Sequence, residues 1–80
     1  MNIIAIRPAA GPKTLAYFDL EIGGHLRIYN LILRRNTEGK LRTVAPQACG
    51  KHAVTFLPKF AEQISQAAAA ALRAAAHVGR

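Results

Sequence analysis

Apolar and polar side chains alternate along the first half of the chain, as they do in β-strands with one buried face. The alternation is clearest over residues 14–22, where the even positions from Ala16 to Ile22 are apolar and Asp19 and Glu21 lie between them. Proline and glycine turn signals separate this run from weaker runs on either side. We therefore predict five short strands, at residues 2–7, 14–22, 26–35, 40–45 and 52–56.

The turn after Ile22 decides how the second and third strands pair. A three-residue loop, Gly23-Gly24-His25, pairs Ile22 with Leu26 and Leu20 with Ile28, and it places Glu21 opposite Arg27 and Asp19 opposite Tyr29. A two-residue loop would instead mix charged side chains into the apolar face. A slip by one residue moves every side chain to the wrong face, so we predict the three-residue loop.

Continued along the third strand, this register places Ile28 and Ile32 on the face that carries Phe18 and Leu20. The opposite face then receives Leu31 and Leu33, together with two aromatic side chains, Tyr17 and Tyr29. Two leucines on an otherwise exposed face need a cover, which a second copy of the chain would supply. We predict a homodimer whose interface contains Tyr17, Leu31 and Leu33, and the short chain with its single cysteine favours the same association.

The last third of the chain has the periodicity of a helix. Apolar residues recur at helical spacing from Phe60 to Val78, Pro58 suits the first helical position, and Gly79 suits the end. Many of the apolar positions are alanines, which favour helix formation and allow close packing. We expect one α+β domain over residues 1–80, with an antiparallel meander sheet of four to five strands followed by one long C-terminal helix packed on one face.

Charge adds a candidate binding surface to this fold. The chain has 11 Lys and Arg residues against 4 Asp and Glu, a formal net charge of +7. Such an excess attracts large anions, of which phosphate backbones are the most common. Six of the 11 basic residues fall between positions 27 and 51, beside an aromatic on which a base can stack. The candidate nucleic-acid-binding residues are Arg27, Tyr29, Arg34, Arg35, Lys40, Arg42 and Lys51.

Several of these candidates also have an ordinary structural role open to them. Arg27 can pair with Glu21, Arg35 and Lys40 can flank a solvated turn, and the tyrosines can pack in an interface. A module that binds an acidic protein partner is the alternative function.

Other chemistry is poorly represented in the chain. The four carboxylates form no acid–base pair, and Cys49 and His52 are only half of a zinc pattern. No stretch has the length and apolarity of a membrane span, and the N-terminal residues do not resemble a signal peptide. We expect no enzyme, cofactor, metal, small-molecule substrate or membrane association, and a cytoplasmic location.

Several stretches, in their order along the chain, are similar to those of a known family. Residues 2–7 end in Ile6-Arg7, residues 15–19 are followed by an apolar strand at 26–33, and Val44-Ala45-Pro46 leads through Lys51 to Pro58. Over residues 2–72 the chain resembles the septation protein family named for stage V sporulation protein G (SpoVG). The resemblance implies a small dimer that binds DNA or RNA, a bacterial regulator or accessory factor.

A looser resemblance concerns the plan of a curved four-stranded sheet followed by one helix. The positive cofactor 4, Whirly and Pur-alpha single-strand binders are similar in this respect. This resemblance implies a dimer that stacks bases on sheet aromatics beside basic residues.

Overall fold

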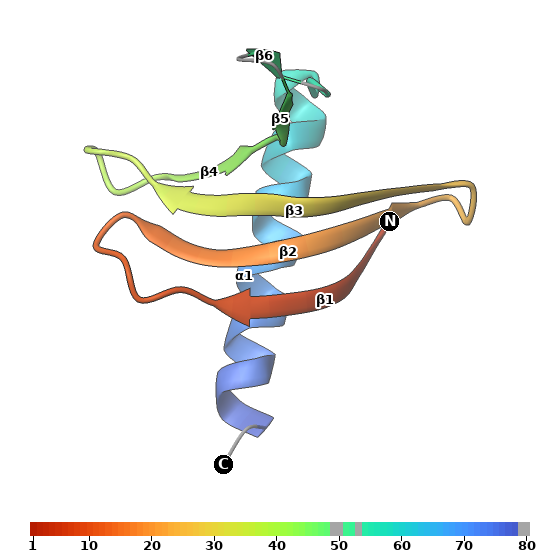
Figure 1. The fold of residues 1–80 in the computed structure, drawn as a ribbon. Coiled ribbons are helices and arrows are strands. Elements are labelled where there is room, and N and C mark those ends of the chain that lie inside the picture. The colour runs from red at the N-terminus through yellow and green to blue at the C-terminus, as the bar shows by residue number, and fades with distance from the viewer. Residues whose placement is uncertain (49–50, 53, 79–80) are drawn as a thin grey trace.

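A four-stranded sheet and one helix make up the fold in the computed structural model, which describes residues 1–48, 51–52 and 54–78 (Figure 1). The sheet is antiparallel and has the strand order β1-β2-β3-β4. The predicted α+β meander followed by a C-terminal helix is confirmed. The elements are β1 (Asn2–Pro8), β2 (Thr14–Ile22), β3 (Leu26–Arg35), β4 (Leu41–Val44), β5 (Gln47–Ala48), β6 (Lys51–His52) and α1 (Pro58–Val78).

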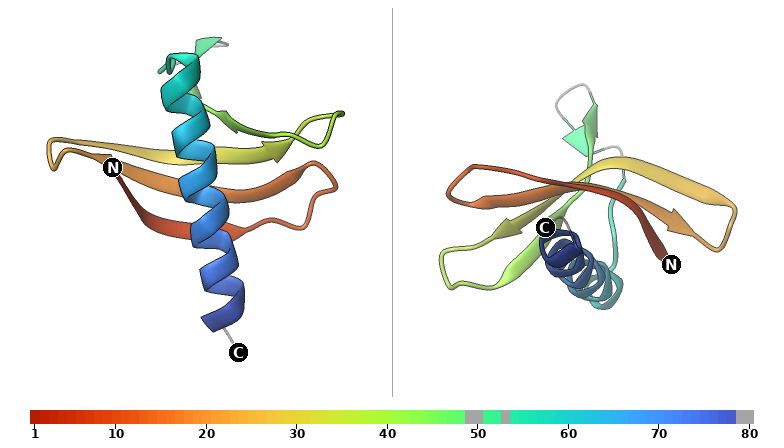
Figure 2. Two further views of the ribbon diagram at one scale, coloured as in Figure 1. Left: turned by 180° about the vertical axis from the view of Figure 1, so that it is seen from behind. Right: turned by 90° about the horizontal axis from the view of Figure 1, so that it is seen from below.

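The sheet and the helix form two layers. α1 runs across the strands on one side of the sheet, while the small β5–β6 ladder projects from the β4 edge toward the other side (Figure 2). Within the described part of the chain, no helix or strand lies over that other side, which we call the open face. No described helix is long and apolar enough to cross a membrane.

The core lies between the sheet and α1. Ala16, Phe18 and Leu20 of β2 are fully buried there, and Ile64 and Ala68 of α1 pack against them. Ala68 and Ala69 of the alanine-rich sequence are buried against the sheet, whereas Ala70, Ala74 and Ala75 are exposed, so only part of this sequence has the packing role that its composition suggests.

A hydrogen bond fastens the helix to the edge of the sheet. The Thr43 and Ser65 hydroxyl oxygens lie 2.8 Å apart, and Ser65 donates to the carbonyl of Ala61 at 3.0 Å. Ser65 is almost fully buried, and these two contacts satisfy its hydroxyl.

The predicted pairing of β2 with β3 is confirmed beside the turn and wrong in the middle of the strands. Ile22 pairs with Leu26, Glu21 with Arg27 and Leu20 with Ile28, as the three-residue loop requires. The predicted pairing of Asp19 with Tyr29 does not form. Instead β3 contains a β-bulge at Tyr29 and Asn30, so that the next pair is Phe18 with Leu31.

A second bulge, in β2, cancels the first. Ala16 pairs with Leu33 but Thr14 pairs with Arg34, which leaves Leu15 as the extra residue on β2. The predicted register therefore holds at both ends of the hairpin and is displaced by one residue between the two bulges.

The displaced middle segment overturns the predicted placement of the leucines. Leu31 and Leu33 are fully buried in the core of the single chain, whereas Ile32 lies on the open face and is half-buried. The physical reason is the bulge, because one extra residue in a strand reverses the faces of all the residues that follow it. Leu31 and Leu33 are consequently not available to a dimer interface.

The chain between β4 and α1 also differs from the prediction. In place of one strand at 52–56, β5 and β6 form a separate ladder, and residues 54–57 belong to no strand. This stretch carries the chain from the sheet to the helix layer, so Val54 and Phe56 pack against the side of the core. Phe56 meets Phe60 edge to face, with ring centroids 6.1 Å apart. Cys49 and Gly79 lie outside the described residues.

Three polar side chains hold the β3 bulge in place from the open face. Asn30 has a φ of 62°, a left-handed conformation that asparagine tolerates better than most residues. Its backbone N–H donates to Asp19 Oδ1 at 2.9 Å, and Arg7 Nη2 donates to its side-chain oxygen, also at 2.9 Å. Arg7 and Asp19 are further joined by an ion pair of 3.4 Å.

These contacts also set the ionisation of Asp19. Removal of the carboxylate from water raises its pKa, but the N–H of Asn30 and the guanidinium of Arg7 together outweigh that effect. The pKa of Asp19 is therefore lowered below its ordinary value, and its charged form stabilises the folded chain.

The left-handed conformation of Asn30 gives a first testable prediction. We expect Asn30→Ala to lower the free energy of unfolding by about 1 kcal/mol more than Asn30→Gly, because both remove the side-chain contact but only alanine resists this φ. Chemical denaturation of the two variants measures the difference. Equal stabilities would contradict the left-handed bulge.

The lowered pKa of Asp19 gives a second prediction. At neutral pH we expect Asp19→Ala to cost about 1–3 kcal/mol of unfolding free energy, because the N–H of Asn30 loses its acceptor. A carboxylate with a depressed pKa contributes stability above its unfolded-state pKa and loses it as the pH falls through its folded-state pKa. The difference from wild type should thus be constant above about pH 5 and shrink below about pH 4. Glu38→Ala is the matched control. If the difference in unfolding free energy between Asp19→Ala and the wild type does not change with pH, the pKa of Asp19 is not lowered in the folded chain.

Candidate functional site

The open face carries a row of side chains that spans all four strands of the main sheet. Through the register, Arg7 of β1 lies opposite Tyr17 of β2, Tyr17 opposite Ile32 of β3, and Ile32 opposite Val44 of β4. Tyr17 is 42% exposed, and Tyr29, at the bulge on the same face, is 54% exposed. Tyr17, Tyr29, Ile32 and Val44 thus form an aromatic and aliphatic surface on this side of the sheet, which we call the strip.

One end of the open face is electrically balanced. Arg7 pairs with Asp19, and Arg27 Nε donates to Glu21 Oε2 at 3.1 Å. The pairing of Arg27 is the structural role that the sequence offered as its alternative. Its side chain remains 58% exposed, but a neighbouring carboxylate offsets its charge. The positive charge of Arg27 is therefore partly compensated.

The other end of the sheet is strongly basic. Arg34 lies opposite Arg42 in the β3–β4 ladder, and the N–H of Arg35 donates to the carbonyl of Lys13 at 2.9 Å. Lys40 follows in the exposed turn between β3 and β4. Within the described ranges, none of these five side chains has a carboxylate within ion-pair distance. We call this group the basic end: Lys13, Arg34, Arg35, Lys40 and Arg42.

Hydrogen bonds within the turn between β3 and β4 fix the conformation of the backbone at the basic end. The side-chain oxygen of Asn36 accepts hydrogen bonds from the N–H of Glu38 at 2.9 Å and of Lys40 at 2.8 Å. Gly39 takes the left-handed conformation that its position predicts, with a φ of 83°. Glu38 is the one carboxylate in this turn, and its side chain is exposed.

A shallow depression lies within the basic end. Its volume is about 480 Å³, and four of its seven lining residues are cationic. We call it the notch, and it is lined by Lys13, Arg34, Arg35, Asn36, Thr37, Arg42 and Val44.

The structure brings together most of the residues that the sequence nominated. Arg34, Arg35, Lys40 and Arg42 lie at the basic end, with Tyr29 farther along β3. Lys51 lies in β6, where its backbone pairs with that of Ala48.

Lys13 belongs to the basic end and was not nominated. The sequence could have revealed it. The register that pairs Leu20 with Ile28, extended to the far end of the hairpin, places residue 13 beside Arg35.

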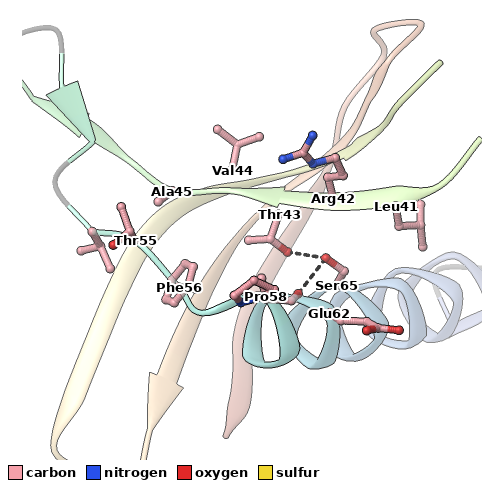
Figure 3. Close-up of a pocket in the computed structure, with 12 residues that line it drawn as sticks. Leu41, Arg42, Thr43, Val44, Ala45, Thr55, Phe56, Pro58, Glu62 and Ser65 are labelled. Atoms are coloured by element: carbon pink, nitrogen blue, oxygen red, sulfur yellow. Dashed lines mark hydrogen bonds between the residues drawn. The ribbon is translucent and has the colours of Figure 1, made fainter. Parts of the chain in front are cut away.

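A second depression lies between β4 and the start of α1, with a volume of about 520 Å³. Figure 3 shows that Leu41 and Thr43 point toward the helix, whereas Arg42 and Val44 point away from it. The lining is largely apolar around the Thr43–Ser65 hydrogen bond, with Glu62 at its margin. Among the described residues, no three His, Cys, Asp or Glu side chains gather in a way that could hold a metal ion.

No protein-family model, curated protein or solved structure matches the chain.

Proposed function

We propose that the chain is a non-enzymatic nucleic-acid-binding protein whose contact surface is the open face with its basic end. The observation that carries the proposal is the position of five cationic side chains at one end of the sheet, without ion-pair partners in the described ranges. A polyanion releases condensed counterions when such groups contact its phosphates, which makes the association favourable.

The strip beside the basic end supports the same function. Tyr17 and Tyr29 are exposed side chains on a sheet face that no described element covers. Aromatic rings beside a basic surface bind unstacked bases with little dependence on sequence, since every base has a π-face. The basic end supplies contacts to the phosphates and the strip supplies contacts to the bases, so the two parts suit different portions of the same ligand.

A homodimer and a cytoplasmic regulatory or accessory role remain part of the proposal. The small size of the chain supports dimerisation. A chain of 80 residues buries only a limited core, and association with a second copy would bury more apolar surface. The interface residue that remains available on the open face is Tyr17, with Ile32 beside it.

Salt-dependent binding to oligonucleotides tests the proposal. We expect labelled single- or double-stranded DNA or RNA to bind at low salt, with a log–log slope of affinity against salt of about −3 to −4 per chain if four or five phosphates are contacted. Fluorescence anisotropy at several salt concentrations measures the slope. If no oligonucleotide binds at low salt, the proposal is overturned. An acidic protein partner is then the next class of ligand to test.

Matched variants locate the surface. Lys40→Ala/Arg42→Ala removes one lysine and one arginine from the basic end, and Lys59→Ala/Arg73→Ala removes the same pair from exposed positions of α1. We expect the first variant to reduce the magnitude of the slope by about 2 and the second to leave it unchanged. Equal effects would show that net charge alone drives binding and that the basic end is not the contact surface.

A further inference from the structure

The notch combines features that point to a defined ligand group instead of diffuse attraction. Arg34 and Arg42 are directly opposed residues of an antiparallel ladder, a position in which like charges destabilise a sheet. Lys13 and Arg35 line the same depression from the adjoining backbone pair. An anion bound in the notch would relieve the repulsion between Arg34 and Arg42, which the ladder places opposite each other.

The remaining lining residues add neutral donors. Asn36 uses its side-chain oxygen to accept two backbone hydrogen bonds, which leaves its amide group as a donor. Thr37, which carries a hydroxyl, also lines the depression. Guanidinium groups present paired N–H donors that match the oxygens of a phosphate, and Arg34 and Arg42 supply two of them. The notch therefore offers charge and directed hydrogen bonds to one tetrahedral anion.

The strand pairing explains why these groups meet at this place. The bulge in β3 places Arg34 on the open face opposite Arg42, and the bulge in β2 pairs it with Thr14 on the other side. Figure 3 shows Arg42 pointing away from the helix, toward that same face. The notch thus adjoins the strip that contains Ile32 and Val44, and a phosphate held there would have its neighbouring nucleotide over the strip.

We propose that the notch is a discrete site for one phosphate group, held by Arg34 and Arg42, with Lys13 and Arg35 also in its lining. This inference rests on the proposed function in that a nucleic acid supplies the phosphate, either as the terminal monoester of a strand or as an internal diester. Bound there, the phosphate fixes where the backbone meets the open face. The other cation of the basic end, Lys40, contributes to the general attraction and lies outside the notch lining.

Inorganic phosphate is the probe for the site itself. We expect a titration at constant ionic strength, with chloride as the balancing anion, to give saturable amide chemical-shift changes at residues 13 and 34–37. Lys13→Gln/Arg34→Gln should lose these changes, and Lys59→Gln/Arg73→Gln should keep them. Changes that do not saturate, or that persist in the notch variant, would overturn the discrete site.

Two oligonucleotides of one sequence, with a 5′-phosphate or a 5′-hydroxyl, distinguish the sources of the phosphate. Tighter binding of the phosphorylated strand, lost in Lys13→Gln/Arg34→Gln, assigns the notch to a terminal monoester. Equal binding of both strands, weakened alike in the notch variant, assigns it to an internal diester. If Lys13→Gln/Arg34→Gln binds oligonucleotides as well as the wild type does, the phosphate site is overturned. The proposed function still stands in that case. If inorganic phosphate saturates the notch but no oligonucleotide binds, the proposed function fails and the phosphate site stands.

Discussion

The register of β3 depends on one carboxylate, that of Asp19, which accepts a hydrogen bond from the backbone N–H of Asn30 and so holds the bulge in place. The extra residue moves Leu31 and Leu33 beneath the sheet, where they are fully buried against α1. Arg7 supports the bulge from the neighbouring strand through both Asp19 and Asn30. A charged network on the exposed side of the sheet therefore determines which apolar side chains form the core on its other side.

The same bulge arranges the candidate site. With regular alternation from Ile28, Arg34 would lie on the helix side of the sheet. The bulge brings it to the open face opposite Arg42, and the compensating bulge at Leu15 restores the pairing of Thr14 with Arg34. Arg7 and Arg27 are offset by Asp19 and Glu21 at the other end, so the excess positive charge of the main sheet is concentrated at the basic end. Stability and the proposed binding surface thus share one structural cause.

Much of this architecture follows from local signals that act over a few residues. The strand at residues 14–22, the loop at Gly23-Gly24 and the helix beginning at Pro58 are all decided by nearby sequence, and the structure confirms them. The bulges are decided by partners distant in sequence. The acceptor of Asn30 lies 11 residues away and its side-chain donor 23 residues away, so alternation within β3 does not reveal them. The place of Lys13 in the notch depends on the same long-range pairing.

Alanine substitution of Ile32 and of Leu33 tests most directly whether β3 contains the bulge, because the bulge decides which of these two neighbours lies in the core. Unfolding free energies of Ile32→Ala and Leu33→Ala are compared by chemical denaturation under the same conditions. We expect Leu33→Ala to cost about 2–5 kcal/mol, or enough to unfold the chain, and Ile32→Ala to cost less than about 1.5 kcal/mol. A greater loss from Ile32→Ala than from Leu33→Ala would show that the bulge does not form.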